Sequence, residues 1–129
     1  MAALATLGIP AERNPGLTGV WTRGRKIASL GIHVKQWVTF HGFALNVLND
    51  LRGFGYVVPC GIQDVTMTSV SRELEDPGDP AELWAGTRAA VVAAVAEAFE
   101  REPVPTPAGN LVLGAGVSLG SLAEPAARA

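Results

Sequence analysis

The alternation of apolar and polar positions predicts several short β-strands in the first half of the chain. Segments that fit half-buried strands are residues 19–22, 26–35, 37–47 and 65–70. In the third of these the alternation changes phase at His41 and Gly42, which indicates a bulge or a bend. The pattern also predicts a turn at Arg23-Gly24 and a short helix that begins within 49–54. Ahead of the strands it predicts a helix over 1–7, which Gly8 ends, and a loop over 9–18.

The clearest helix signal begins at Asp79. Asp79 suits the cap, Pro80 the first helical position, and Glu82 the position from which a side chain bonds back to the cap. One apolar stripe then recurs every four residues, at Leu83, Thr87, Val91, Val95 and Phe99. This face is expected to pack on a sheet, and the prolines that follow end the helix near Arg101. Together these elements predict an α+β fold with a mostly antiparallel sheet packed with helices.

Composition narrows the class of protein. The 129 residues form one domain at most, and 48% hydrophobic with 17% charged residues is typical of a globular chain. A net charge of −2 gives no electrostatic footprint for nucleic acid. No apolar run approaches the roughly 18 residues of a membrane span, and no signal-peptide pattern is seen, so we predict a cytoplasmic protein without a membrane partner. Residues 103–129 are predicted to be a poorly ordered tail, in which 111–120 could form a strand.

The single cysteine, Cys60, is the main candidate for chemistry. Pro59 and Gly61 flank it and discourage helix and strand interiors, so Cys60 is predicted to lie on an accessible turn. The alternative is a buried cysteine that packs as a small apolar side chain, which is the commoner role. One cysteine excludes an internal disulfide and a thiolate metal site. Because no metal-site spacing, P-loop or dinucleotide fingerprint occurs, no cofactor is predicted.

Two residues could activate this thiol. Lys26 begins an apolar strand, and its ammonium would favour the thiolate; the alternative is an ordinary solvated lysine. His41 could serve as the general base of a Cys–His pair; the alternative is a histidine that ties the bulge to the backbone. The residues alone leave these alternatives open. Of the other conspicuous side chains, Trp21, Trp37 and Trp84 are predicted in the core, His33 at the surface, and Asn46 and Asp50 in structural roles.

Three blocks of this sequence resemble the octanoyltransferases of lipoate biosynthesis. They are KIASLG from Lys26, HGFALNV from His41 and PCGI from Pro59, in the order and at the spacing of that family. The resemblance extends from about Ala2 to about Glu100 and covers the second half of such an enzyme. The Arg-Gly-Gly segment and the His-Gly-Pro-Gly turn of the first half are not found. The resemblance therefore implies a biotin/lipoate protein ligase-like fold that is incomplete on its N-terminal side, with residues 1–102 as the catalytic half.

The family resemblance also implies roles for individual residues. Cys60 would take an octanoyl group from octanoyl-acyl carrier protein as a thioester, and a lysine of a lipoyl domain would then attack it. Lys26 would lower the pKa of the thiol and shuttle the proton. Residues implied in substrate binding are Ser29, Leu30, Gly31, Gly42, Phe43 and Ala44. The acceptors would be the lipoyl domains of 2-oxoacid dehydrogenases and the glycine cleavage H protein.

The sequence also fits functions of other classes. The chain could be a non-catalytic remnant, or one half of a split enzyme that acts only with a partner chain carrying the N-terminal half. This hypothesis is motivated by the missing first half, whose absence would leave a sheet edge and an apolar face uncovered. A redox-sensing thiol is a weaker alternative, because the chain lacks a second cysteine to resolve the oxidised form.

Overall fold

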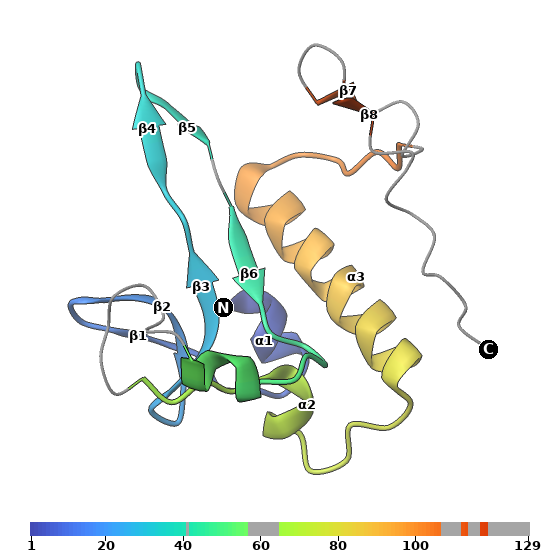
Figure 1. The fold of residues 1–129 in the computed structure, drawn as a ribbon. Helices are drawn as coiled ribbons and strands as arrows, with labels where there is room; N and C mark the ends of the chain where they lie inside the picture. The colour runs from blue at the N-terminus through green and yellow to red at the C-terminus, as the bar shows by residue number, and fades with distance from the viewer. Residues whose placement is uncertain (41, 57–64, 107–111, 114–116, 119–129) are drawn as a thin grey trace.

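The chain folds as a small antiparallel sheet flanked by helices (Figure 1). The structure, a computed structural model, describes residues 1–40, 42–56, 65–106, 112–113 and 117–118. The helical elements are α1 (Ala2–Thr6), the 3₁₀-helix η1 (Arg52–Tyr56), α2 (Val70–Glu73) and α3 (Pro80–Phe99). The strands are β1 (Glu12–Asn14), β2 (Leu17–Thr22), β3 (Arg25–Leu30), β4 (His33–Lys35), β5 (Val38–Phe40), β6 (Phe43–Leu45), β7 (Val112–Leu113) and β8 (Val117–Ser118).

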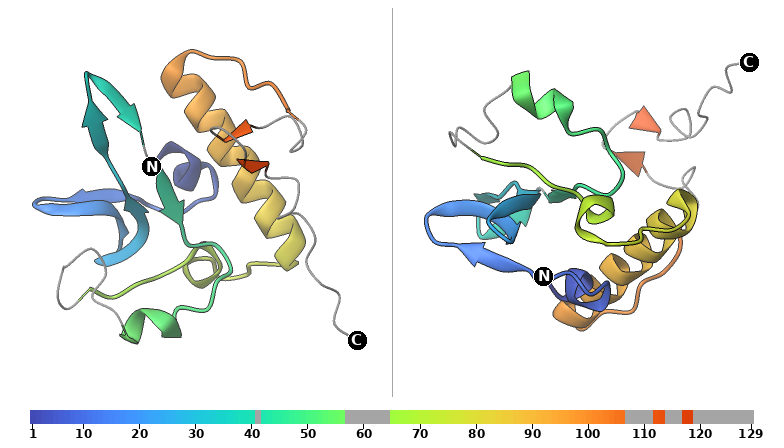
Figure 2. Two further views of the ribbon diagram at one scale, coloured as in Figure 1. Left: turned by 45° about the horizontal axis from the view of Figure 1, so that its top comes forward. Right: turned by 90° about the horizontal axis from the view of Figure 1, so that it is seen from below.

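The main sheet has the strand order β1-β2-β3-β6, and every ladder in it is antiparallel. Figure 2, right, shows α1 and α3 together on one side of these strands and η1 on the other. The core lies where α1, β3, α2 and the first turns of α3 meet, and it includes Leu4, Ile27, Val70 and Leu83. The predicted α+β class with a mostly antiparallel sheet is therefore confirmed.

Two tight hairpins build the first part of the sheet. The predicted loop over 9–18 is wrong in part, because β1 forms there and β2 begins at Leu17. Pro15 and Gly16 make the turn between them, with Gly16 at a φ of +79°. β1 has only three residues, which is too short to show an alternation. The predicted turn at Arg23-Gly24 is confirmed: both residues have positive φ, which suits a two-residue hairpin.

The two longer predicted strands are each divided. The first, over 26–35, contains β3 and β4, and the second, over 37–47, contains β5 and β6. In the second, β5 ends at Phe40 and β6 begins at Phe43, which is where the phase change predicts an interruption. The N–H of Gly31 donates to the Gly42 carbonyl at 2.9 Å just beyond the β3–β6 ladder. Past this point β4 and β5 pair with each other as a separate two-stranded sheet and form a hairpin that projects away from the body of the protein (Figure 1).

The predicted strand over 65–70 is not a strand. Its residues make a single parallel bridge, between Met67 and Lys26, and α2 already begins at Val70. The β-forming side chains therefore meet a partner strand at only one position, which is too little for a ladder. The short helix expected to begin within 49–54 is present as η1 and starts at Arg52, after Asp50 accepts a hydrogen bond from the Arg52 N–H at 3.0 Å.

Helix α3 begins as predicted and ends two residues early. The Asp79 carboxylate accepts hydrogen bonds from the N–H groups of Ala81 and Glu82, and Pro80 occupies the first helical turn. The helix ends at Phe99, because Glu100 adopts a left-handed conformation with a φ of +51°. Only the first part of the predicted apolar stripe is covered: Leu83 and Thr87 are buried, whereas Phe99 is 72% exposed. The expectation that the whole stripe packs on a sheet is therefore wrong.

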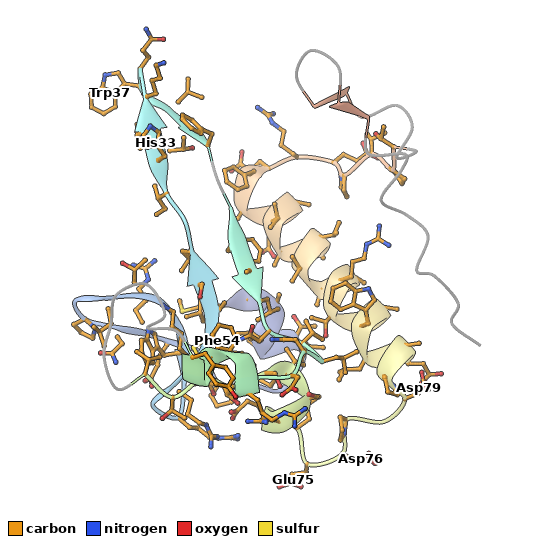
Figure 3. The ribbon with its side chains drawn as sticks, viewed as in Figure 1. His33, Trp37, Phe54, Glu75, Asp76 and Asp79 are labelled. Carbon is orange, nitrogen blue, oxygen red and sulfur yellow. The ribbon has the colours of Figure 1, made fainter. Side chains whose placement is uncertain are left out.

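The three tryptophans differ in their environments. Trp21 is buried as predicted, but Trp37 and Trp84 are exposed, and the expectation that they belong to the core is wrong. Trp84 lies on α3 and is 54% exposed. Trp37 lies in the turn of the β4–β5 hairpin, and Figure 3 shows it at the tip. Of the tail, the structure describes part, and there β7 and β8 pair as a short hairpin. In the described part of the chain, no helix has the length and apolar character needed to cross a membrane.

Candidate active site

Lys26 is fully buried near the start of β3, although lysine is among the side chains least often buried. It pairs across the β2–β3 ladder with Trp21. The Lys26 Nζ lies 5.9 Å from the centre of the Trp21 ring, which is in range for a cation–π interaction. The alternative of an ordinary solvated lysine therefore does not apply to this residue.

The backbone of Lys26 is joined to the segment that follows the PCGI block. Its N–H donates to the Thr66 carbonyl at 2.8 Å, and its carbonyl accepts from the Thr68 N–H at 2.9 Å. Thr66 comes six residues after Cys60 in the sequence. Because six residues extend over about 20 Å at most, the chain itself keeps Cys60 within that distance of Thr66.

Cys60 and His41 lie outside the residues that the structure describes. The turn predicted around Pro59 and Gly61 lies outside them as well. The nucleophile and the alternative base therefore stay predictions.

The substrate-binding candidates come together in one ladder between β3 and β6. Ser29 pairs with Ala44 and Leu30 pairs with Phe43, and the Gly31 N–H donates to the Gly42 carbonyl at 2.9 Å. Every candidate from the KIASLG block thus faces one from the HGFALNV block, on the same strand that carries Lys26. The sequence shows the two blocks as separate segments, and the antiparallel register places them side by side. Because successive side chains of a strand alternate between the faces of a sheet, the Leu30–Phe43 pair and the Ser29–Ala44 pair lie on opposite faces.

An apolar cavity of about 420 Å³ lies between this ladder and the helices α1 and α3. From the sheet it is lined by Val20, Ala28, Leu30, Phe43 and Leu45. Helix α3 contributes the uncovered part of its stripe, including Val95 and Phe99. Of the binding candidates, Leu30 and Phe43 line this cavity, whereas Ser29, Gly31, Gly42 and Ala44 do not.

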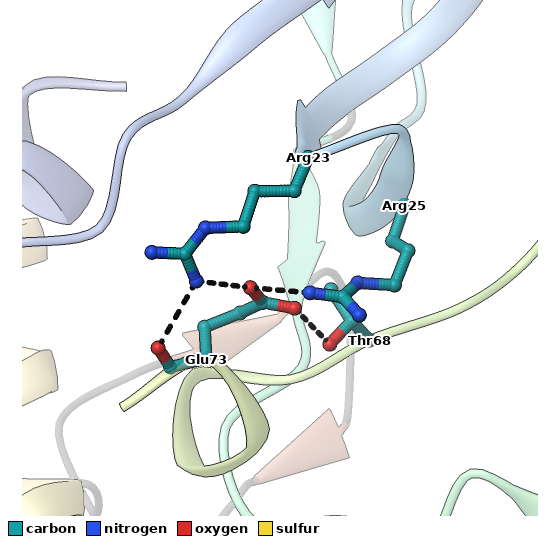
Figure 4. A network of polar contacts seen from close by, with 4 residues as sticks. All are labelled: Arg23, Arg25, Thr68 and Glu73. Atoms are coloured by element: carbon teal, nitrogen blue, oxygen red, sulfur yellow. Dashed lines mark hydrogen bonds and ion pairs between the residues drawn. The ribbon is translucent and has the colours of Figure 1, made fainter. Parts of the chain in front are cut away.

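A buried carboxylate, Glu73, holds the β2–β3 turn against α2. Figure 4 shows the carboxylate between Arg23 and Arg25, with Thr68 beside it. Its Oε2 lies 3.0 Å from the Arg23 Nη1 and 2.9 Å from the Arg25 Nη2, and the Glu73 side chain is fully buried. The Thr68 hydroxyl donates to the other carboxylate oxygen at 2.5 Å. Arg23 lies in the turn and Arg25 directly follows it as the first residue of β3, so the cluster fixes the start of β3 next to Lys26.

The charge state of Glu73 follows from these contacts. Burial acts to raise the pKa of Glu73, but the hydrogen bonds from Thr68 and Arg25, the charge of Arg25 and the bond from Arg23 outweigh it. The net result is a pKa below its ordinary value, so the carboxylate is ionised at neutral pH. Thr68 connects this carboxylate to the segment that bonds to the backbone of Lys26.

Sequence reasoning missed the partners of this cluster. Arg23, Arg25, Thr68 and Glu73 all stand in the sequence, but the arginines are separated from the carboxylate by about 50 positions. A crowd of basic residues around Lys26 and acidic residues after Cys60 was the only signal. The predicted structural role of Asn46 is confirmed, because its Nδ2 donates to the Thr68 carbonyl at 3.0 Å and holds the same segment. The role of Asp50 is confirmed by its bonds to Arg52.

His33 lies at the surface as predicted, on the projecting hairpin labelled in Figure 3. Its ring lies 4.6 Å from that of Phe40 across the β4–β5 ladder, so it packs against an aromatic neighbour.

Comparisons with known proteins identify the family. Residues 1–100 match the family model described as the lipoyl protein ligase A/B catalytic domain. The octanoyltransferase of Geobacter sulfurreducens is 45% identical over 103 residues, which are 80% of this chain and 44% of that protein. An octanoyltransferase of a Nostoc species is 46% identical over 101 residues, 78% of this chain and 43% of that protein. A Synechococcus octanoyltransferase is 62% identical over 61 residues, 47% of this chain and 23% of that protein.

The chain spans less than half the length of these curated relatives. The fold that the resemblance implies and the match over residues 1–100 agree with the antiparallel sheet and helices described above. The sequence resemblance to octanoyltransferases is confirmed, and the chain belongs to the family of the lipoyl protein ligase A/B catalytic domain.

Proposed function

We propose that residues 1–102 form the catalytic half of an octanoyltransferase domain, followed by a tail over 103–129. The reaction moves an octanoyl group from octanoyl-acyl carrier protein to a lysine of a lipoyl domain, such as those of 2-oxoacid dehydrogenases or the glycine cleavage H protein. Cys60 is the nucleophile and Lys26 is its proton-transfer partner. The site of action is the cytoplasm, and no cofactor takes part.

The chemistry divides into two acyl transfers. The Cys60 thiolate attacks the thioester carbonyl of the donor, the carbon–sulfur bond to the carrier breaks, and the Lys26 ammonium gives its proton to the departing thiolate. The amine of the acceptor lysine then attacks the Cys60 thioester and forms an amide. Lys26 takes up the proton that this amine loses, and Cys60 leaves as a thiolate.

The observation that carries this proposal is the burial of Lys26 on β3 together with its backbone bonds to Thr66 and Thr68. A buried ammonium near a thiol favours the thiolate more strongly than an exposed one, because the surroundings screen its charge less. The family resemblance supplies the pairing with Cys60. The described residues supply a lysine that is removed from water and held by the segment leading back to that cysteine.

The acyl chain has an apolar surface available beside the ladder of binding candidates. Leu30 and Phe43 line the cavity of about 420 Å³, and the chain's glycines at 31 and 42 leave the adjoining backbone open to close approach. Each methylene of an octanoyl chain that leaves water contributes about 0.8 kcal/mol. Binding against Leu30 and Phe43 would therefore select an extended apolar acyl group.

The test is intact-mass spectrometry of the purified chain after incubation with octanoyl-acyl carrier protein. We expect an octanoyl adduct that hydroxylamine removes and that Cys60→Ser abolishes. Lys26→Ala should slow adduct formation strongly at neutral pH. Lys35→Ala is the matched control, because Lys35 is an exposed lysine on β4, and it should leave the rate unchanged.

A full rate in Lys26→Ala would show that the assigned dyad is wrong. His41→Ala would then test the alternative base in the same assay. An adduct that persists in Cys60→Ser would exclude the thioester altogether.

A second candidate is a chain that acts only with a partner chain supplying the rest of the domain, or a remnant that no longer acts. The observation that favours it is the apolar surface on the projecting hairpin and along α3, where Ile32, Trp37 and Phe99 are exposed. Sedimentation and thermal unfolding of the purified chain test this. A monodisperse monomer that unfolds cooperatively would contradict the need for a partner. Adding the unmatched part of the Geobacter sulfurreducens relative separates the remaining cases, since restored adduct formation means a split enzyme and continued inactivity means a remnant.

A further inference from the structure

A close contact involves a residue outside the predicted site, Gly19 of β2. Gly19 adopts a φ of +147°, a conformation that residues with a side chain rarely adopt. A methyl group built at this position would lie 2.7 Å from the Cε of Lys26 and 3.4 Å from its Cδ. It would also lie 2.9 Å from the Ala28 carbonyl oxygen. The Lys26 side chain therefore occupies the space in which a side chain of residue 19 would begin.

The Lys26 side chain lies near two residues of β2. The centre of the Trp21 ring is 5.9 Å from the Lys26 Nζ. The backbone of Gly19, two residues earlier along β2, lies beside the Lys26 Cε. The register of the β2–β3 ladder shifts between Val20 and Trp21, which brings Lys26 opposite Trp21 instead of one position away.

We propose that Gly19 is a positioning residue for Lys26: the missing side chain at position 19 lets the buried lysine extend across β2 and sets where its ammonium lies. This inference rests on the proposed function, in which Lys26 serves Cys60. A methyl at position 19 would meet the flexible end of the lysine and a backbone oxygen. The end of the lysine side chain is flexible and moves at low cost, whereas the Ala28 oxygen belongs to the backbone of β3, so the β2–β3 ladder must also shift locally. Both shifts displace the ammonium.

The variant Gly19→Ala tests the proposal, with Gly16→Ala as the matched control. Gly16 also has a positive φ, +79°, but a methyl there meets nothing within 4 Å. Both variants therefore strain the backbone, and only Gly19→Ala crowds Lys26. The readout is the pH dependence of Cys60 alkylation by iodoacetamide, measured on the whole chain by mass spectrometry. A merely structural role for Gly19 would not move this profile.

We expect Gly19→Ala to raise the midpoint of alkylation toward about 8.5, the value of a free thiol, and we expect the same of Lys26→Ala. Gly16→Ala should keep the wild-type midpoint. In a Lys26→Ala background, Gly19→Ala should add no further shift, because the group through which it acts is gone. A wild-type midpoint in Gly19→Ala together with a raised midpoint in Lys26→Ala would overturn this inference and leave the proposed function standing. An unchanged midpoint in Lys26→Ala would overturn the proposed function, and this inference with it.

A second measurement needs no variant and covers the case in which Gly19→Ala fails to fold. Native chains are treated briefly with an amine-reactive ester, and the modified lysines are mapped by mass spectrometry. Lys26, packed over Gly19, should react at least about tenfold more slowly than exposed Lys35. Equal rates for the two lysines would show that the Lys26 side chain does not stay in this position, and would overturn the proposal.

Discussion

The two ends of the chain segment 25–35 differ in how its side chains are covered. At the β3 end a lysine, Lys26, has no exposed surface, and Ile27 beside it is fully buried. At the β4 end the hairpin with β5 carries Val34 and Val38 in the open, and Trp37 at its tip is 98% exposed. The residue types alone would suggest the reverse. The difference lies in what reaches each end: residues 66–73 close over the first, and no described segment closes over the second.

This contrast indicates that the burial of Lys26 depends on polar groups contributed by a segment about 40 residues later in the chain. Thr66, Thr68 and Glu73 supply the hydrogen bonds and the charge that surround the start of β3. Buried polar groups must be paired, so each of these residues stabilises the site only while its partners remain. The β4–β5 hairpin forms its own two-stranded ladder, separate from the main sheet.

The largest difference in the free energy of unfolding should be between variants of two tryptophans. Trp21 on β2 packs at the covered β3 end, and Trp37 lies at the open β4 end. Trp21→Ala removes a buried ring that packs beside Lys26 and should lower the free energy of unfolding by about 4 kcal/mol. Trp37→Ala removes an exposed ring and should change it by less than about 0.5 kcal/mol. Urea denaturation of the two variants against wild type measures both. A loss in Trp37→Ala as large as that in Trp21→Ala would mean that the hairpin tip is covered in solution, and the contrast would fail.

Removing both arginines of the cluster should have the next largest effect. With Arg23→Met and Arg25→Met combined, the buried Glu73 carboxylate keeps Thr68 but no cation. We expect a loss of about 2 kcal/mol at neutral pH, because the half-exposed arginines are the cations that compensate the buried carboxylate. Arg52→Met is the control: it breaks the exposed pair with Asp50, which should leave the unfolding midpoint unchanged. Equal effects of the two replacements would show that burial of Glu73 contributes nothing.

The third prediction, with the smallest effect, concerns how the stability of the folded chain depends on acid pH through Glu73. The pKa of Glu73 is lowered in the folded chain from an ordinary value of 4.5. Its contribution to stability is therefore complete above that ordinary value and is lost as pH falls through the lowered one. In the double arginine variant no cation opposes burial, so burial raises the pKa of Glu73. The carboxyl then becomes neutral as pH falls, and the difference in the free energy of unfolding between wild type and this variant should shrink. Unfolding midpoints across this pH range measure both trends, and an acid dependence that is the same in Glu73→Gln as in wild type would contradict them.

Particular residues show how far sequence reasoning reached. Asp79 and Pro80 start α3 as predicted, because capping depends on neighbours within one turn. The break at 41–42 was visible as a phase change, since alternation is also local. The binding candidates came from two blocks without a known register, and their pairing as Ser29 with Ala44 and Leu30 with Phe43 required the sheet. Trp37 was misplaced because its type favours burial, whereas its position in a turn with positive φ directs it outward.

The sequence by itself determined the α+β class, the order of most elements and the octanoyltransferase resemblance, because these follow from local pattern and from motifs. It named Lys26 as a candidate through that resemblance. Only the tertiary structure decided that Lys26 is buried, that Gly19 makes room for it, and that Glu73 holds the turn before it. Each of these contacts joins residues on different strands or far apart in the chain. Such contacts depend on strand register and on the docking of residues 66–73, which no periodicity within one segment encodes.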